Sequence, residues 1–147
     1  DHLLEFARRL RDEHGYDYLS SITGVDYFPE DRMEVVYHVY KSTGGSGIEF
    51  KVVTGRDNPE VTSLVSLYDG ANFQEREIWD LYGIYFNKHP DLRRILTDYG
   101  FEGYPMRKDF PLSGYVELRY SQNKKRIIVE PLELTQDFRY FNFETPW

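Results

Sequence analysis

The residues that could carry chemistry are concentrated in residues 72–110. The first part of this stretch is expected to be a helix in which Glu75, Glu77 and Asp80 place three carboxylates close together. Carboxylates at such spacing can act as general acids and bases, or can bind a metal together with a histidine. His89 is the histidine that follows them. Acid–base catalysis and metal binding are therefore the two chemistries to weigh.

Neither chemistry has the sequence pattern that it usually requires. The stretch supplies no nucleophile beside a base, and no cradle for a leaving group. None of the four histidines lies three or four residues from another, so the local spacing of a metal site is missing. The simplest interpretation is a solvated helical turn in which Arg76 pairs with Asp80 and contributes ~0.3–0.5 kcal/mol.

The helix that carries these residues has recognisable ends. Asn72 is predicted to be the N-cap, because its side-chain oxygen can accept a hydrogen bond from a free amide of the first turn. Glu75 could reach back to that cap. Gly83 is typical of the left-handed residue that ends a helix. At helical spacing Glu75, Ile78 and Trp79 share the side that we expect to be buried.

The same stretch carries a motif that continues along the second half of the chain. The motif reads Glu75-Arg76-Glu77, two residues, Asp80-Leu81-Tyr82, six residues, His89, three residues, Arg93, one residue, Ile95-Leu96. This pattern resembles the signature of the C subunit of respiratory complex I, the proton-pumping NADH:ubiquinone oxidoreductase. Residues 92–115 and 130–147 are also similar to this family. The tail resembles its mitochondrial and proteobacterial branch, including the mitochondrially encoded subunit 9 type, more than its plastid branch.

The resemblance implies a cofactor-free core subunit of the hydrophilic arm that supports the quinone-reducing module beside the D and B subunits. The complex uses FMN, iron–sulfur clusters, NADH and ubiquinone, while this chain would bind no cofactor and would not be catalytic. The implied location is the matrix side of the mitochondrial inner membrane, or the cytoplasmic face of a bacterial inner membrane. The alternative is a homologous subunit of another membrane-bound oxidoreductase, such as a plastid-type complex or a membrane hydrogenase.

In that family the motif residues are expected to be structural and interface residues, with no catalytic, cofactor-binding or metal-binding residue among them. The charged candidates are Glu75, Arg76, Glu77, Asp80, His89, Arg93, Arg94, Arg107, Lys108 and Asp109. The aromatic candidates in the tail are Phe138, Tyr140, Phe141 and Trp147. The charges would hold residues 99–114 against the body or a neighbour. Because large exposed apolar patches usually mark partner surfaces, we expect residues 131–147 to lie along another subunit.

The composition of the 147 residues excludes several classes of protein. A net charge of −7 without a basic stripe argues against nucleic acid as the main partner. No apolar run reaches the ~18 residues of a membrane helix, so the chain is not expected to span a bilayer by itself. The chain contains no cysteine, which removes the thiolate ligands that hold iron–sulfur clusters.

The hydrophobic pattern predicts an α+β fold, with a mixed or antiparallel sheet and helices packed on it. We expect helices at 1–14, 59–68 and 72–82, and strands at 18–27, 33–41, 48–54, 84–86 and 94–96. A long loop at 99–114 is expected next, then a hairpin of residues 115–120 and 126–130, with its basic turn in solvent. Residues 1–130 would form a single domain, and 131–147 an extended interface tail.

Overall fold

A computed structural model describes residues 2–141 and 143–145, and the chain divides into two compact units, Asp1–Phe110 and Pro111–Trp147. The first unit contains α1 (His2–Asp12), β1 (Tyr18–Asp26), β2 (Met33–Tyr40), β3 (Ile48–Thr54), β4 (Glu60–Thr62), α2 (Ala71–Tyr82) and β5 (Tyr85–Asn87). The second unit contains β6 (Val116–Ser121) and β7 (Arg126–Pro131). The predicted α+β class is confirmed. The expected domain limits, 1–130 and 131–147, stay a prediction, since compactness alone does not define a folding domain.

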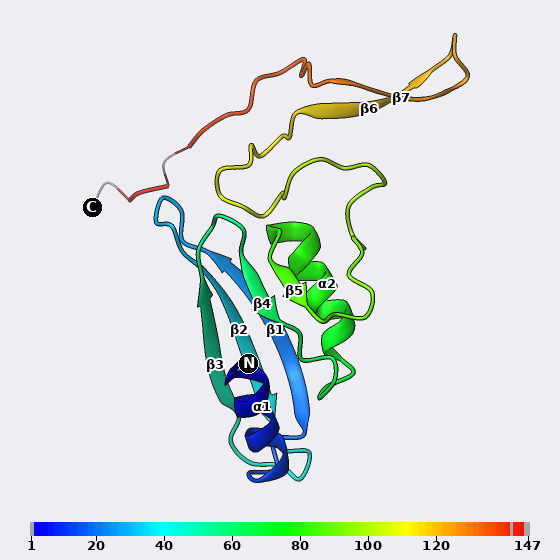
Figure 1. The fold of residues 1–147 in the computed structure, drawn as a ribbon. Helices are drawn as coiled ribbons and strands as arrows, with labels where there is room; N and C mark the ends of the chain where they lie inside the picture. Colours follow the sequence, from blue (N-terminus) through cyan, green and yellow to red (C-terminus); the bar gives the residue numbers. More distant parts are fainter. Residues whose placement is uncertain (1, 142, 146–147) are drawn as a thin grey trace. The chain divides into compact units, whose positions relative to one another are not determined.

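Strands β1, β2 and β3 form an antiparallel sheet in chain order, as the alternating sequence predicts (Figure 1). Met33, Val35, Tyr37 and Val39 point to one face of the central strand and have no exposed surface. Tyr37 stacks on Phe50 of β3, with ring centroids 4.9 Å apart. Phe6 meets the same Phe50 ring edge-on at 5.3 Å, so α1 packs on this face of the sheet.

Helix α2 connects two short parallel strands and packs along β1. β4 and β5 pair in parallel from Glu60 opposite Tyr85 to Thr62 opposite Asn87. Gln74 of α2 accepts a hydrogen bond of 2.5 Å from the Ile22 amide of β1, and Ile78 of α2 is buried in the core. The helix that carries most of the motif is therefore fixed to the main sheet.

Two elements predicted from the sequence are wrong. Residues 59–68 do not form a helix, because residues 60–62 pair with β5 and only one turn follows, closed by hydrogen bonds to the Leu64 carbonyl. Val61, Leu64 and Tyr68 are nevertheless buried, so the pattern identifies core residues but assigns the wrong element. Residues 94–96 do not form a strand either, since the amides of Ile95 and Leu96 bind a side chain of α2 instead of a neighbouring strand.

The ends of α2 agree with the prediction only in part. The predicted N-cap role of Asn72 is wrong, because the helix begins at Ala71, with Gly70 at the cap position and no side-chain cap bond. Gly83 ends the helix as predicted, with a φ of 73° and its N–H bonded to the Trp79 carbonyl. A Cβ atom on Gly83 would lie 2.6 Å from the Tyr104 ring, so glycine is required there for space as well as for conformation.

The second unit is a hairpin followed by a chain without regular structure. β6 and β7 pair antiparallel, from Val116 opposite Pro131 to Ser121 opposite Arg126, which confirms the predicted hairpin. After β7, residues 132–141 and 143–145 contain no helix or strand. Across the described parts of both units, no helix is long and apolar enough to cross a membrane.

Candidate functional site

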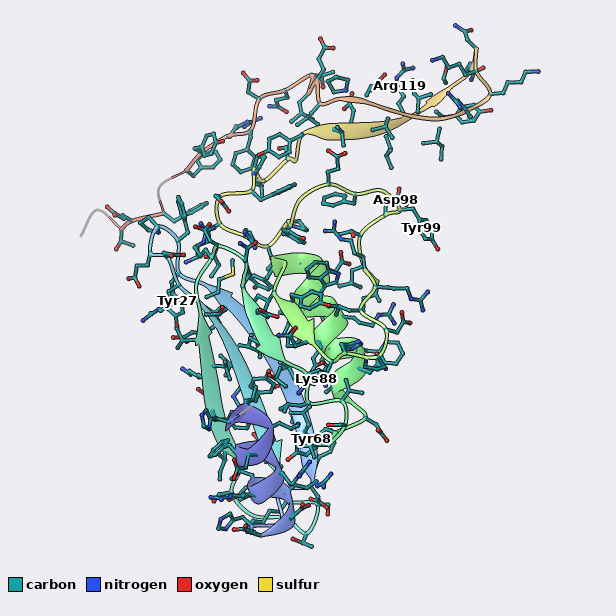
Figure 2. The ribbon with its side chains drawn as sticks, viewed as in Figure 1. Tyr27, Tyr68, Lys88, Asp98, Tyr99 and Arg119 are labelled. Carbon is teal, nitrogen blue, oxygen red and sulfur yellow. The ribbon has the colours of Figure 1, made fainter. Side chains whose placement is uncertain are left out.

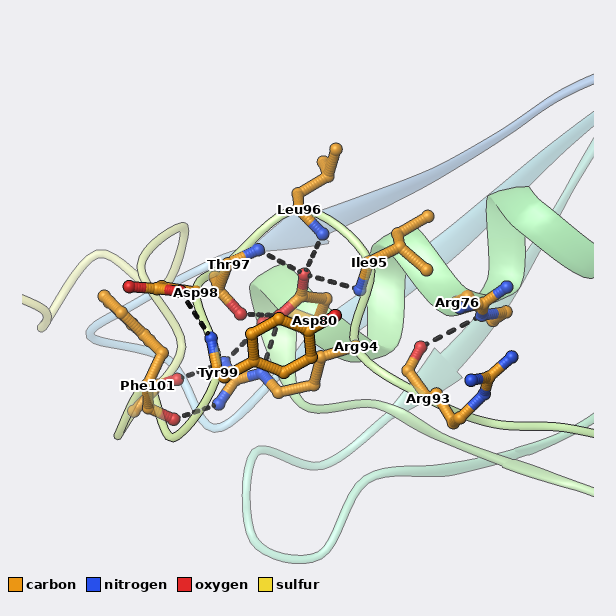
Figure 3. Close-up of polar contacts among 11 residues, drawn as sticks. Arg76, Asp80, Arg93, Arg94, Ile95, Leu96, Thr97, Asp98, Tyr99 and Phe101 are labelled. Carbon is orange, nitrogen blue, oxygen red and sulfur yellow. Dashed lines mark hydrogen bonds and ion pairs between the residues drawn. The ribbon is translucent and has the colours of Figure 1, made fainter.

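Asp80 is the centre of the motif in three dimensions. Its side chain has no exposed surface and faces the segment that follows β5. Oδ2 accepts hydrogen bonds from the amides of Ile95 (3.1 Å), Leu96 (2.7 Å) and Thr97 (2.9 Å), as Figure 3 shows. Oδ1 accepts from the Thr97 hydroxyl (2.5 Å) and from Nε of Arg94 (2.6 Å). One buried carboxylate thus fixes the backbone of three consecutive residues that belong to no helix or strand.

The same hydrogen bonds keep Asp80 ionised. Burial alone would raise the pKa of Asp80, but the hydrogen bonds from Thr97 and Arg94 outweigh it and hold the pKa well below its usual range. A carboxylate that is shielded from solvent and accepts five hydrogen bonds has no proton to give near neutral pH. Asp80 is therefore suited to hold structure, and it is not suited to be a general acid or base.

Arg94 extends these contacts along residues 93–110, which contain no helix or strand and are called the loop 93–110 below. Its Nη1 donates to the Phe101 carbonyl at 2.7 Å, and Nη2 donates to the carbonyls of Asp80 (2.9 Å) and Gly103. The guanidinium also lies over two rings, 5.4 Å from the centroid of Phe101 and 5.1 Å from that of Tyr104. All three nitrogens of Arg94 thus have partners, and cation–π contact adds to the hydrogen bonds.

The loop also completes the C-terminal end of α2. A helix leaves its last four carbonyls without partners inside the helix, and they must be satisfied from elsewhere. The donors here are the Gly83 amide to Trp79 (2.9 Å), Arg94 Nη2 to Asp80 (2.9 Å), the Met106 amide to Leu81 (3.0 Å) and Arg107 Nε to Tyr82 (2.6 Å). Two donors are guanidinium groups, whose positive charge is favourable at this end of a helix.

A second buried carboxylate, Asp26 at the end of β1, fastens the far end of the loop. Its oxygens accept hydrogen bonds from Arg56 Nε (2.9 Å) and from the Lys108 amide (2.9 Å). Arg56 Nη2 also donates to Asp109 at 2.9 Å. Burial opposes ionisation of Asp26, but the hydrogen bonds from Arg56 and Lys108 lower its pKa overall. Sequence reasoning missed Asp26 and Arg56, since no local spacing connects them with the motif.

Glu75 is fully buried and differs electrostatically from Asp80. Its Oε2 accepts a hydrogen bond from the Ser63 hydroxyl (2.6 Å), and Oε1 accepts one from the Leu64 amide (2.7 Å). Burial raises the pKa of Glu75 to about 7, because these two hydrogen bonds offset only part of the desolvation. The predicted reach of Glu75 back to the N-cap is wrong, since Glu75 holds the turn after β4 instead.

His89 completes the turn after β5. Its Nε2 donates to the Asn72 carbonyl at 3.1 Å, and its Nδ1 accepts from the Asp91 amide at 3.0 Å. These two bonds describe a neutral imidazole with the proton on Nε2. The Glu75 carboxylate is 3.9 Å from Nε2, which is too far for a hydrogen bond. His89 therefore has a structural position beside Glu75.

The predicted pairing of charges along α2 is wrong. Arg76 does not pair with Asp80 but donates to the Arg93 carbonyl at 3.0 Å (Figure 3). The Arg76 guanidinium also lies over the Phe73 ring. The solvated interpretation holds for Glu77, which is exposed, but fails for Glu75 and Asp80. The physical reason is that helical spacing shows which residues share a face, and cannot show which face the rest of the fold covers.

The other predicted residues lie at the surface. Arg93 pairs with Asp91 in a solvent-exposed contact of 2.8 Å. In the second unit, Phe138, Tyr140 and Phe141 are exposed by 48%, 88% and 66%. Figure 2 shows Tyr99, at the outer turn of the loop, pointing away from the ribbon. Trp147 lies outside the described residues, and the interface role of the tail stays a prediction.

The hollow beside the loop is lined by residues other than the predicted carboxylates. A hollow of about 720 Å³ lies beside the loop and is lined by Arg56, Arg107, Trp79, Tyr85 and Tyr104, with further residues of 57–60 and 83. None of Glu75, Glu77 and Asp80 lines it. Among the residues that the structure describes, no three or more His, Asp or Glu side chains are grouped as a metal site. The arrangement is thus suited to fix a loop.

Comparisons with known proteins agree on one family. The family model described as respiratory-chain NADH dehydrogenase, 30 kDa subunit, matches residues 1–116. The C subunit of the NADH-quinone oxidoreductase of Sinorhizobium medicae is 52% identical over 149 residues, which cover 99% of this chain and 73% of the relative. The NADH-ubiquinone oxidoreductase subunit 9 of Reclinomonas americana is 54% identical over 131 residues, which cover 88% of this chain and 63% of that protein.

A solved structure shares the fold at lower identity. It is the membrane-bound sulfane sulfur reductase, described as an archaeal respiratory membrane complex. The TM-score is 0.68 at 28% sequence identity, and the match covers 76% of this chain and 68% of the other. The fold is therefore also found in a respiratory complex of another kind.

Proposed function

Since the chain belongs to the family of the 30 kDa subunit of respiratory-chain NADH dehydrogenase, we propose that it is a structural subunit of a proton-pumping NADH:quinone oxidoreductase. The family predicted from the motif in residues 75–96 is thereby confirmed. In our proposal the chain belongs to the hydrophilic arm and contributes to the quinone-reducing module without catalysing a step itself.

The observation that carries the structural role is that the charged candidate residues form hydrogen bonds within the chain itself. Asp80, the least exposed acid of the motif together with Glu75, accepts five hydrogen bonds, all from residues 94–97. Arg94 and Arg107 donate to backbone carbonyls of the same unit. Groups that are occupied in this way order a loop and are not available to bind or activate a substrate.

We further propose that the chain holds no cofactor, and that FMN, the iron–sulfur clusters, NADH and ubiquinone are bound by other subunits. The lack of cysteine in the 147 residues supports this proposal, because thiolates are the usual ligands of such clusters. The proposed neighbours are the D and B subunits. The proposed contacts are the ordered loop 93–110 and the aromatic residues of the tail.

The proposed location is a peripheral arm on one side of an energy-converting membrane. The similar proteins include a bacterial C subunit and the subunit 9 of Reclinomonas americana. Both the matrix side of the mitochondrial inner membrane and the cytoplasmic face of a bacterial inner membrane agree with these relatives. We propose the first, with the second as the alternative, and the resemblance of residues 135–141 to the mitochondrial and proteobacterial branch favours both over a plastid location.

A related role in another membrane-bound oxidoreductase is the second candidate. The fold shared with the sulfane sulfur reductase complex favours it. The sequence favours the NADH-linked enzyme, since identity is 52% to the C subunit of an NADH-quinone oxidoreductase and only 28% to the chain of that complex.

The test is a native gel of gently solubilised source membranes, stained for NADH dehydrogenase activity and probed for this chain. We expect the chain to run with the large active band and to leave no free pool. A chain that runs alone, with the active band intact, would contradict the proposed role. An isolated chain that turns over a substrate would instead favour an independent enzyme that uses Glu75, Glu77, Asp80 and His89.

A further inference from the structure

The β6–β7 hairpin has one face made only of apolar and aromatic side chains. In an antiparallel pair, residues directly opposite each other project to the same side, and alternate residues share a face. The register places Val116 opposite Pro131, Leu118 opposite Val129 and Tyr120 opposite Ile127. We call these six residues the apolar face of the hairpin.

Within its own unit, the apolar face is exposed to solvent. Leu118 and Tyr120 are each exposed by 57%, Ile127 by 67% and Val129 by 65%. Figure 2 shows side chains projecting from both sides of this hairpin, where Arg119 is labelled. An isolated two-stranded hairpin is only marginally stable in water, and one that exposes a continuous apolar face needs something to cover it.

The opposite face carries charged side chains that find partners on the hairpin itself. There Arg119 forms two parallel hydrogen bonds to Glu130, of 2.8 and 3.0 Å. Glu117 lies directly opposite Glu130, and Ser121 opposite Arg126. One ribbon therefore has a charged side, on which Ser121 is buried and Glu117, Ile128 and Glu130 are half-buried, and an apolar side whose residues are more exposed. This division predicts that the apolar side is the one that a partner covers.

The turn of the hairpin is positively charged, and the proposed function assigns no role to it. Lys124, Lys125 and Arg126 lie at this turn, in a chain whose net charge is −7. The apolar face thus ends at a turn that carries Lys124 and Lys125, while Arg126 belongs to the charged face opposite Ser121. A complementary surface would be an apolar strip with carboxylates where the turn reaches it, because opposite charges at an interface favour one orientation.

The size of the face indicates what kind of partner covers it. Two strands of six residues form a face only ~20 Å long and ~10 Å wide, by the usual rise and spacing of strands. A stable free-standing pair of proteins usually buries ~800 Å² per partner, which is much more. The face is therefore too small to hold two copies of this chain together. It fits as one part of a larger contact in a multi-subunit enzyme.

We propose that the apolar face of the hairpin docks on a neighbouring subunit of the same enzyme, on an apolar strip that ends in acidic side chains beneath the Lys124–Arg126 turn. This inference rests on the proposed function, since it requires the chain to be a subunit. A protein partner is favoured over an anionic membrane surface, because the net charge of −7 opposes adsorption to a uniformly negative lipid surface, whereas a protein can place carboxylates only beneath the turn.

Photo-crosslinking in the assembled enzyme tests the proposal. A bacterial strain carries this chain in place of its own C subunit, with Tyr120→p-benzoyl-phenylalanine on the apolar face or Glu117→p-benzoyl-phenylalanine on the charged face as control. We expect the Tyr120 probe to link to a peptide of another subunit, and the Glu117 probe to give little product. A third probe, Asn123→p-benzoyl-phenylalanine, reports the surroundings of the turn and should link to a peptide rich in Asp or Glu.

A matched pair of variants measures the contribution of the face. The double variant Leu118→Thr with Val129→Thr introduces β-branched residues, which suit a strand, and removes apolar surface from the apolar face. Ile128→Thr makes the same kind of change on the charged face of β7. We expect the double variant to lower recovery of this chain in the purified enzyme by about tenfold, the equivalent of ~1.4 kcal/mol. The Ile128→Thr control should stay within about twofold.

The outcomes separate this inference from the proposed function. If the chain is present in the active enzyme but the Tyr120 probe links only to lipid, only to a second copy of this chain, or to nothing, the docking proposal is overturned and the subunit role stands. If the chain is absent from the enzyme, both fail. Equal recovery of the double variant and the Ile128→Thr control would also overturn the docking proposal.

Discussion

The loop 93–110 and the β6–β7 hairpin are unusual in opposite ways. Charged groups that hold the loop are buried, whereas apolar side chains of the hairpin are exposed. The loop has no helix or strand. It is held by hydrogen bonds to charged groups, and two of these groups, Asp80 and Asp26, are buried. The hairpin is regular, yet its apolar side chains are exposed. A buried charge needs its partners within the chain, whereas an exposed apolar face needs a partner outside it.

This difference teaches where the effect of a mutation should be measured. Changes to the buried charges should lower the free energy of unfolding of the chain itself. Changes to the exposed apolar and aromatic residues should leave the chain stable and weaken its assembly with other subunits. The following predictions test this division, beginning with the largest expected effect on stability.

Replacement of Asp80 should have the largest effect. Asp80→Ala leaves Arg94 and three backbone amides without their shared acceptor, and removal of one partner of a buried pair typically costs ~3–5 kcal/mol. Urea unfolding of the full chain measures the loss. Glu77→Ala on the same helix is the control and should change the free energy of unfolding by no more than ~0.5 kcal/mol, because Glu77 is exposed. Equal effects of the two changes would contradict the role of Asp80.

Glu75 should make stability depend on pH. Its pKa is about 7 in the folded chain and 4.5 as the ordinary value, so the folded state binds the proton more tightly. The contribution of the protonated form is fully present below pH 4.5 and is lost as the pH rises through about 7. Relative to Glu75→Gln, the free energy of unfolding should fall by ~3 kcal/mol across this window.

Unfolding curves between about pH 4 and pH 8 measure this loss. Asp80 and Asp26 do not contribute in that window, since their pKa values are lowered and their protonation belongs to more acidic solutions. Glu77→Gln is the matched control and should leave the pH dependence unchanged. A Glu75→Gln variant with the same pH profile as the parent chain would show that Glu75 does not titrate in this range.

Replacement of Arg107 should lower both the stability of the chain and the amount of assembled enzyme. Arg107→Ala removes the hydrogen bond to the Tyr82 carbonyl and the contact with the Tyr104 ring, which should cost ~1–3 kcal/mol. We expect the amount of assembled enzyme and its total NADH dehydrogenase activity to fall in proportion, as measured on native gels and in membranes. Arg93→Ala, on a side chain that is 71% exposed, should have little effect. Normal abundance with reduced turnover would contradict a purely structural Arg107.

The exposed aromatic residues of the tail should show the opposite behaviour. Tyr140 is 88% exposed, so Tyr140→Ala should change the free energy of unfolding of the free chain by no more than ~0.5 kcal/mol. Recovery of the chain in the assembled enzyme should nevertheless fall, because the ring would be buried only against a partner. Tyr140→Phe retains the ring and should assemble normally. Unchanged recovery of Tyr140→Ala would remove Tyr140 from the proposed interface.

Most elements of the fold follow from local sequence pattern. Alternating side chains identify β1, β2 and β3, the spacing of Leu3, Phe6 and Leu10 identifies α1, and Gly83 marks the end of α2. The hairpin β6–β7 is predictable for the same reason. In each case the contacts that decide the element lie within a few residues, or between consecutive strands, and are therefore visible in the pattern.

The candidate site is predictable in its residues but not in its contacts. The motif fixes Asp80 and leaves the position of Arg94 open, and spacing alone favours Arg76, four residues away, as the partner of Asp80. The actual partners of Asp80 are 14 to 17 residues further along the chain. Asp26 and Lys108 are 82 residues apart, and no spacing rule connects them.

The sequence by itself therefore determined the family, the α+β class and the elements whose stabilising contacts are local. Only the tertiary structure decided that residues 60–62 form a strand, because their partner, β5, begins 25 residues later. It also decided that Glu75 and Asp80 are buried, since burial depends on which distant segment covers a helix face. The physical reason is the same in both cases. Periodicity encodes the face of an element, whereas the partner of that face is selected by packing and charge satisfaction across the whole chain.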